Sequence, residues 1–123
     1  MLITAGLLLA LATALGAIGT HMLRPRLSAE QLEIYDTAVR YHFFNALGLL
    51  GMGAVARTFD SVLLRLAAAL ILIGVVLFCG GLYAGVFGVR GAVRIVPPCG
   101  GMALIIGWLL FAVAIWRKSP ANP

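Results

Sequence analysis

The longest charge-free stretch of the chain reads LAAALILIGVVLFCGGLYAGVFGV and runs from Leu66 to Val89. Its 24 residues exceed the roughly 20 that a helix rising about 1.5 Å per residue needs to cross a hydrocarbon core of about 30 Å. Two further windows without Asp, Glu, Lys or Arg hold 22 or more residues each, namely Met1 to Leu23 and Ile95 to Trp116. The sequence therefore predicts membrane-spanning helices on both sides of this stretch.

The composition agrees with a membrane protein and excludes a separate soluble domain. Of the 123 residues, 63% are hydrophobic and 11% charged, with a mean hydropathy of +1.08, against about 45–50% and about 25% in soluble domains. Four spans would use about 80 positions, which leaves no room for most kinds of enzyme. The net charge of +5 comes from basic residues scattered at the ends of apolar segments. We expect these residues to contact membrane lipids, and we expect no nucleic-acid partner.

A fourth helix is expected between the first two long windows. The charge-free window from Tyr41 to Ala56 has only sixteen residues, so it reaches spanning length only if the helix starts near Thr37, with the Arg40 side chain snorkelling back to the headgroups. Upstream, Ser28 and Gln31 have the spacing of a capping box. The helix is therefore predicted to begin outside the bilayer, near residue 29.

These segments predict an all-α, polytopic membrane protein, an antiparallel bundle of four transmembrane helices. The helices are expected near 2–22, 29–56, 62–88 and 97–117, within a single domain over 1–117 that is followed by a disordered tail over 118–123. The connections are short and the spans even in number, so both termini should lie on one side. Four basic residues on that side stand against five on the other, and the positive-inside rule favours neither orientation.

The fifteen glycines are predicted to serve helix packing. Small residues four positions apart let membrane helices approach closely, and we assign this role to Gly16, Gly81, Gly85, Gly100, Gly101 and Gly107. A pore would need polar groups along its full depth. The sequence does not supply them.

Several polar residues are expected at one depth. Antiparallel threading puts His21, His42, Asn45, Tyr83 and Cys99 within roughly 10 Å of the same membrane face, with Cys79 somewhat deeper. This layer has two interpretations. It could be a ligand site formed by His21, His42, Asn45 and Tyr83. Alternatively, it could be a structural cluster in which His42 and Asn45 provide hydrogen-bond partners for Tyr83, His21 and nearby carbonyl groups.

Metal and catalytic sites are not expected in this layer. No pair has a short metal-ligand spacing, so we expect no metal and no cofactor. No nucleophile elbow, buried carboxylate pair or phosphate-binding loop is present, which argues against an enzyme. Cys79 and Cys99 stand in apolar context and are predicted to be buried free thiols.

Four segments carry a family resemblance: GAIGTHML (16–23), TAVRYHFFNAL (37–47), LFCGGLY (77–83) and PCGGMALIIGW (98–108). In order and spacing they resemble the YgdD-like family of small bacterial inner-membrane proteins, a domain-of-unknown-function family with mitochondrial relatives. The matching positions are His21, Thr37, Tyr41, Tyr83, Gly100, Gly101 and Trp108. Asn45 stands where the family pattern usually has histidine, and Gly81 where it often has serine.

The resemblance implies four helices and a multi-pass location in the bacterial inner membrane, without a settled activity. From size, glycine-rich faces and the lack of catalytic groups, we expect an accessory or scaffold subunit of a larger membrane complex, with other membrane proteins or further copies of the chain as partners. The alternative is a module that binds or transports a small molecule, a lipid or a quinone through the polar layer. A redox carrier is a third interpretation, and it would require haem.

Overall fold

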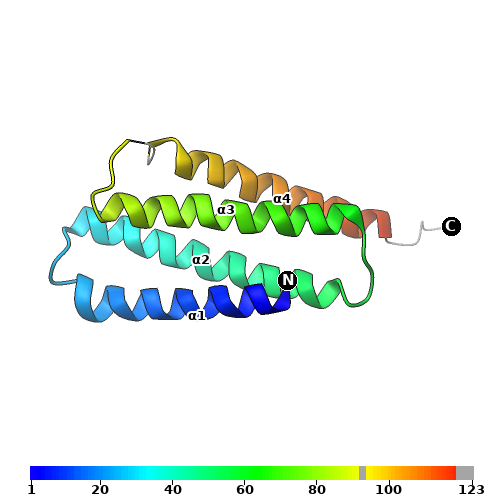
Figure 1. The fold of residues 1–123 in the computed structure, drawn as a ribbon, viewed down its shortest axis with the longest axis horizontal. Helices are drawn as coiled ribbons and strands as arrows, with labels where there is room; N and C mark the ends of the chain where they lie inside the picture. Colours follow the sequence, from blue (N-terminus) through cyan, green and yellow to red (C-terminus); the bar gives the residue numbers. More distant parts are fainter. Residues whose placement is uncertain (92–93, 119–123) are drawn as a thin grey trace.

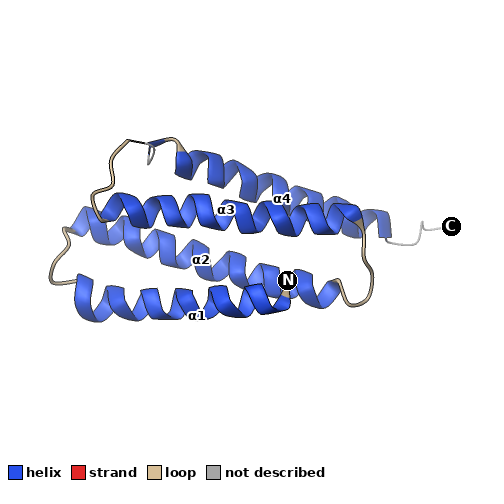
Figure 2. Cartoon of the chain, in the orientation of Figure 1, coloured by secondary structure: helices blue, strands red, loops and turns tan. Residues whose placement is uncertain are grey.

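The computed structural model describes residues 1–91 and 94–118, and all of their regular structure is helical (Figure 2). The α-helices are α1 (Leu2–Ile18), α2 (Ala29–Val55), α3 (Val62–Val86) and α4 (Val96–Lys118). A π-helical turn, η1 (Gly19–Leu23), continues α1. The predicted all-α class is confirmed.

The helix ends follow local hydrogen bonds. The predicted capping box of α2 is confirmed, because the Gln31 amide donates to Ser28 Oγ at 3.2 Å and the Ser28 amide donates to Gln31 Oε1 at 3.0 Å. Ser61 caps α3 in the same way by accepting from the Leu64 amide at 3.1 Å. After α3 the chain turns at Gly88, whose φ of +86° suits a residue without a Cβ.

Most helix ends lie within one residue of the sequence-based ranges, and two differences have consequences. The helix expected over 62–88 ends at Val86, just before the left-handed Gly88. Lys118 belongs to α4, so the tail predicted over 118–123 cannot begin there. The rest of that tail, 119–123, lies outside the described residues.

Each helix packs antiparallel against the next one in the sequence (Figure 1). Helices α3 and α4 form the closest pair, and α2 and α3 are the central pair of the array. Of the described residues, none brings α1 within 8 Å of α4, measured between Cα atoms. The helices therefore form an open array, in which the backbone of α1 packs against α2 and not against α3 or α4 within the described residues.

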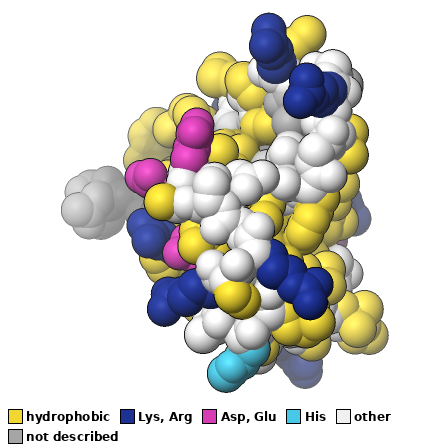
Figure 3. Space-filling model, turned by 90° about the vertical axis from the view of Figure 1, so that its left-hand side faces the viewer, with side chains coloured by type: hydrophobic (Ala, Val, Ile, Leu, Met, Phe, Trp, Pro, Cys, Tyr) yellow, Lys and Arg dark blue, Asp and Glu magenta, His cyan; other side chains and the backbone are white. Residues whose placement is uncertain are grey.

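Three segments are long and apolar enough to cross a membrane: Leu2–Leu23, Val62–Val86 and Val96–Lys118. Helix α2 falls short because Arg40, His42 and Asn45 interrupt its apolar part. Figure 3 views the end of the molecule where α2 begins, and charged side chains gather there while the flanks are largely apolar. The structure thus supports a membrane protein with three candidate spans among four helices.

Candidate functional site

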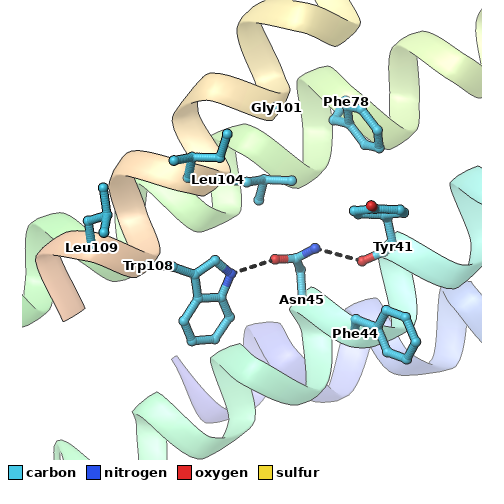
Figure 4. A pocket seen from close by; sticks show the side chains of 9 residues that line it. Tyr41, Phe44, Asn45, Phe78, Gly101, Leu104, Trp108 and Leu109 are labelled. Atoms are coloured by element: carbon cyan, nitrogen blue, oxygen red, sulfur yellow. Dashed lines mark hydrogen bonds between the residues drawn. The ribbon is translucent and has the colours of Figure 1, made fainter. Parts of the chain in front are cut away.

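A groove of about 720 Å³ runs between α2 and α4, with α3 beneath it (Figure 4). Aromatic side chains dominate its walls: Tyr41 and Phe44 come from α2, Phe78 from α3 and Trp108 from α4. The remaining lining residues are Asn45, Gly101, Leu104, Ile105 and Leu109. The groove lies beside the middle of α2 and α4, so in a bilayer it would open toward the hydrocarbon.

The polar groups of this groove include the amide of Asn45, which is 5% exposed. Its Oδ1 accepts from Trp108 Nε1 at 2.9 Å, and its Nδ2 donates to the Tyr41 carbonyl at 2.8 Å. The amide therefore ties α2 to α4. An apolar molecule could enter the groove without breaking either bond.

The approach of Trp108 to α2 depends on Gly48. A Cβ built on Gly48 would collide with Cη2 and Cζ2 of the Trp108 ring. The sequence analysis missed this pairing and the Trp108 hydrogen bond. A glycine one turn after a buried amide was the available signal, but the partner is 63 positions away in the chain.

His42 lies in a separate cluster between α2 and α3. It is 3% exposed, and its Nδ1 is 3.3 Å from the hydroxyl of Tyr83. Its Nε2 is buried and has no hydrogen-bond partner among the described residues. The imidazole is thus a half-satisfied group inside the array.

Tyr35 completes this cluster on the side of α1. It is 1% exposed, its ring centroid is 5.4 Å from that of Tyr83, and its hydroxyl donates to the Leu15 carbonyl. The ring lies against Gly19, where a Cβ would come within 2.5 Å of Cε1. Tyr35 therefore joins α1, α2 and α3, a role that the sequence analysis did not assign.

The predicted hydrogen-bonded cluster of these polar residues forms only in part. His42 and Tyr83 meet, but Asn45 bonds to Trp108 instead, and His21 is exposed on η1. Depth along the membrane normal cannot tell which side of a helix a residue occupies, and the residues of this layer point in different directions.

The prediction for the two cysteines is correct in part. Both are free, as expected, and Cys79 is buried. Cys99 is exposed, contrary to the prediction, because it lies in the first turn of α4 on the side away from α3. Within the described residues, no three His, Cys, Asp or Glu lie close enough to hold a metal ion.

Glycines make the close seam between α3 and α4. A Cβ on Gly100 would strike the backbone of Phe78, while Cβ atoms on Gly81 and Gly107 would come within 2.8 Å of Pro97 and Ile71. Of the other glycines given a packing role, Gly16 and Gly101 leave ordinary contact distances of 3.5 and 3.6 Å, and Gly85 is half-buried. Gly74 was missed, although a Cβ there would lie 2.7 Å from Leu104.

Comparison with known families matches residues 15–101 to the family described as "Protein of unknown function (DUF423)". The chain belongs to the DUF423 family. The match includes η1, α2, α3 and the first residues of α4, and with them His42, Asn45, Tyr83 and Gly100. Trp108 lies beyond it.

Relatives of this DUF423 chain are membrane proteins from several bacteria. It is 34% identical to the UPF0382 membrane protein YwdK of Bacillus subtilis over 105 residues, 85% of each chain. It is 35% identical to a UPF0382 membrane protein of Haemophilus influenzae over 105 residues, 85% of this chain and 84% of the relative. No solved structure matches.

The resemblance drawn from the sequence motifs is confirmed by a further relative. The UPF0382 inner membrane protein YgdD of Escherichia coli is 30% identical over 104 residues, which cover 85% of this chain and 79% of YgdD. The DUF423 chain is therefore a YgdD-like membrane protein.

Proposed function

We propose that this DUF423 protein is a non-enzymatic, four-span protein of the bacterial inner membrane that serves as an accessory or scaffold subunit of a larger membrane complex. The observation that carries the proposal is the pairing of Asn45 with Trp108. The amide that could have bound a ligand is used to join two helices. The His42 and Tyr83 pair joins α2 to α3 in the same manner. These polar groups act as connections between helices.

The fourth span follows from the position of α2. Its Gly53 lies against Leu2 at one end of α1, and its Tyr35 lies against Gly19 at the other. Helix α2 therefore runs alongside α1 over the whole length of a candidate span. If α1 and α3 cross the bilayer, α2 crosses with them, from about Thr37 to Val55.

Reporter fusions test this arrangement. With four spans, a reporter fused at the N-terminus and one fused at the C-terminus have the same activity pattern, because both lie on one side. With three spans the two reporters lie on opposite sides, and that result would contradict the proposal. Fusions after Arg57 and after Arg90 serve as controls for the two loop faces.

The subunit role requires surface on α1 and α4 that the chain itself leaves uncovered, and both helices have such surface. Large apolar side chains such as Leu7 on α1 and Leu109 on α4 are 67% and 62% exposed. Helix packing against other subunits would cover such faces. Extraction in a mild detergent, followed by native mass measurement, should give a reproducible assembly. A monomer without any co-purifying protein would argue against this role.

A second candidate function uses the groove between α2 and α4. Its aromatic walls and internally paired amide suit the apolar chain of a lipid or a quinone. The alternative from the sequence placed such a ligand at the polar layer, and the groove now replaces that location. Lipid and quinone analysis of the purified protein should find a stoichiometric molecule, and Gly101→Leu should displace it. Gly80→Leu is the control, because a Cβ there meets nothing within 4 Å.

A further inference from the structure

The outward side of α2 carries a continuous row of exposed residues at spacings of three or four. The row is Glu33, Asp36, Arg40, Phe44, Leu47, Gly51 and Ala54, and every member is exposed. The buried residues of α2, such as His42 and Leu49, lie on the opposite side. We call this row the α2 seam. Its spacing is that of the contact line in left-handed helix pairs.

The N-terminal part of the α2 seam carries charged residues at a depth where α1 is apolar. Tyr35 lies against Gly19 and Val39 against Gly16, so Asp36 and Arg40 lie level with the last turns of the Leu2–Leu23 segment. Among the described residues, no ion pair joins Arg40 to Asp36 or to Glu33. Arg40 lies inside the proposed span, which begins near Thr37, and Asp36 lies at its edge. Charged side chains within spanning segments almost always face protein or water and pair with one another.

We infer that the α2 seam is the contact surface for a second copy of this chain in a parallel, two-fold dimer. Asp36 and Arg40 are one turn apart, about 6 Å along the axis, and both face outward. In a parallel two-fold pair identical residues lie at the same height, and the long Arg40 side chain of each chain can reach diagonally across one turn to Asp36 of the other, which gives two equivalent ion pairs. The surface is complementary in charge to itself.

The C-terminal part of the α2 seam also fits a parallel dimer. Phe44 and Leu47 are 61% and 52% exposed, and they provide side chains that interdigitate across the axis. At Gly51 a Cβ would meet nothing within 4 Å, and with Ala54 one turn later the two backbones can approach closely. Copies inserted in the same direction can pair only in parallel. An antiparallel pair would bring Arg40 against this apolar end and leave it without an acid.

The inference rests on the proposed four-span arrangement, since the seam lies inside the membrane only if α2 crosses it. Cross-linking tests it in the full-length chain with Cys99→Ser as background. Oxidation in native membranes should link Leu47→Cys into a disulfide-bonded dimer. Ile73→Cys on α3 should stay monomeric, although Ile73 is 50% exposed and lies beside the middle of its helix. Equal cross-linking at both positions, or none at Leu47→Cys, would overturn the dimer, as would a product with a different protein.

Charge exchange provides the second measurement. Asp36→Arg alone or Arg40→Asp alone places like charges across the axis and should raise the dimer dissociation constant about tenfold or more. The double exchange, Asp36→Arg with Arg40→Asp, should restore the dimer to the level of the unchanged chain. Because the positions are exposed in one copy, the amount of folded protein should not change. A double exchange that stays monomeric would contradict the inference, whereas the terminal reporters test the four-span arrangement separately.

Discussion

His42 and Asn45 lie one turn apart on α2, yet the groups around them differ. Asn45 is paired through both its oxygen and its nitrogen. His42 has one contact, with Tyr83, and a buried nitrogen that has none within the described chain. Leaving a buried polar atom unpaired costs about 1–3 kcal/mol in water-soluble proteins. The two residues should therefore respond differently to substitution by an apolar side chain.

Asn45→Leu should destabilise the protein more than His42→Leu does. Removing the Asn45 amide leaves the Trp108 N–H without its acceptor, and hydrogen bonds inside membranes average about 0.6 and reach about 1.7 kcal/mol. Removing His42 leaves the Tyr83 hydroxyl without this contact, which is long at 3.3 Å, but it also removes the unpaired Nε2, so the net loss should be smaller. Thermal unfolding in detergent measures both. If His42→Leu is the more harmful change, or abolishes a co-purifying molecule, His42 belongs to a binding site.

The cysteines should differ in labelling. In intact membranes a polar maleimide should react with Cys99, which is exposed in the first turn of α4, and not with Cys79, which is 1% exposed inside the array. Denaturation should make both thiols reactive. Cys99→Ser provides the control for the native reaction. Rapid native labelling of Cys79 would mean that water reaches the space between α2 and α3.

At the scale of the helices, the seam between α3 and α4 depends on the absence of side chains at a few positions. Gly100→Ala should disrupt this seam, because its Cβ would meet the backbone of Phe78, which cannot move aside as a flexible side chain can. Overpacking of this kind typically costs about 1–3 kcal/mol. We expect a lower thermal midpoint and less protein in the membrane.

Gly80→Ala is the matched control for this substitution. Gly80 lies on α3 in open space, and alanine in a helix interior is favoured over glycine by about 0.5–1 kcal/mol. The control should be neutral or slightly stabilising. Equal effects of Gly100→Ala and Gly80→Ala would show that helix propensity, rather than close contact, decides these positions.

The sequence was sufficient to predict the helices but not the partners of their side chains. Charge-free windows located α1, α3 and α4, and the Ser28–Gln31 spacing located the start of α2. These features depend on neighbouring residues alone. The bond between Trp108 and Asn45 and the packing of Tyr35 on Gly19 depend on how helices rotate about their axes. Neither residue depth nor apolar sequence context gives information about that rotation, which is why the prediction of a buried Cys99 was wrong.

For the whole molecule, the proposed fourth span requires that a helix with charged and polar residues enter the bilayer. Helix α2 packs against α1 on one side and α3 on another, and its buried face carries His42 and Asn45. The apolar neighbours thus cover the polar residues that α2 could not expose to lipid. Helix α2, the least apolar of the four helices, thus connects α1 to α3 in the open array.

This arrangement predicts that α2 inserts only with its neighbours. In an insertion assay, the segment 29–57 alone should fail to span, because an Arg such as Arg40 near the centre of a test segment costs about 2.5–3.5 kcal/mol and Asn45 and His42 would meet lipid. The segment 62–90, which contains α3, should span alone. The chain 1–90 should hold α2 across the membrane, since α1 and α3 are both present. Arg40→Leu should let the isolated segment insert. If 29–57 spans unaided without this change, α2 does not need its neighbours, and the Asn45 and Tyr35 contacts serve only to fix the rotation of the helices.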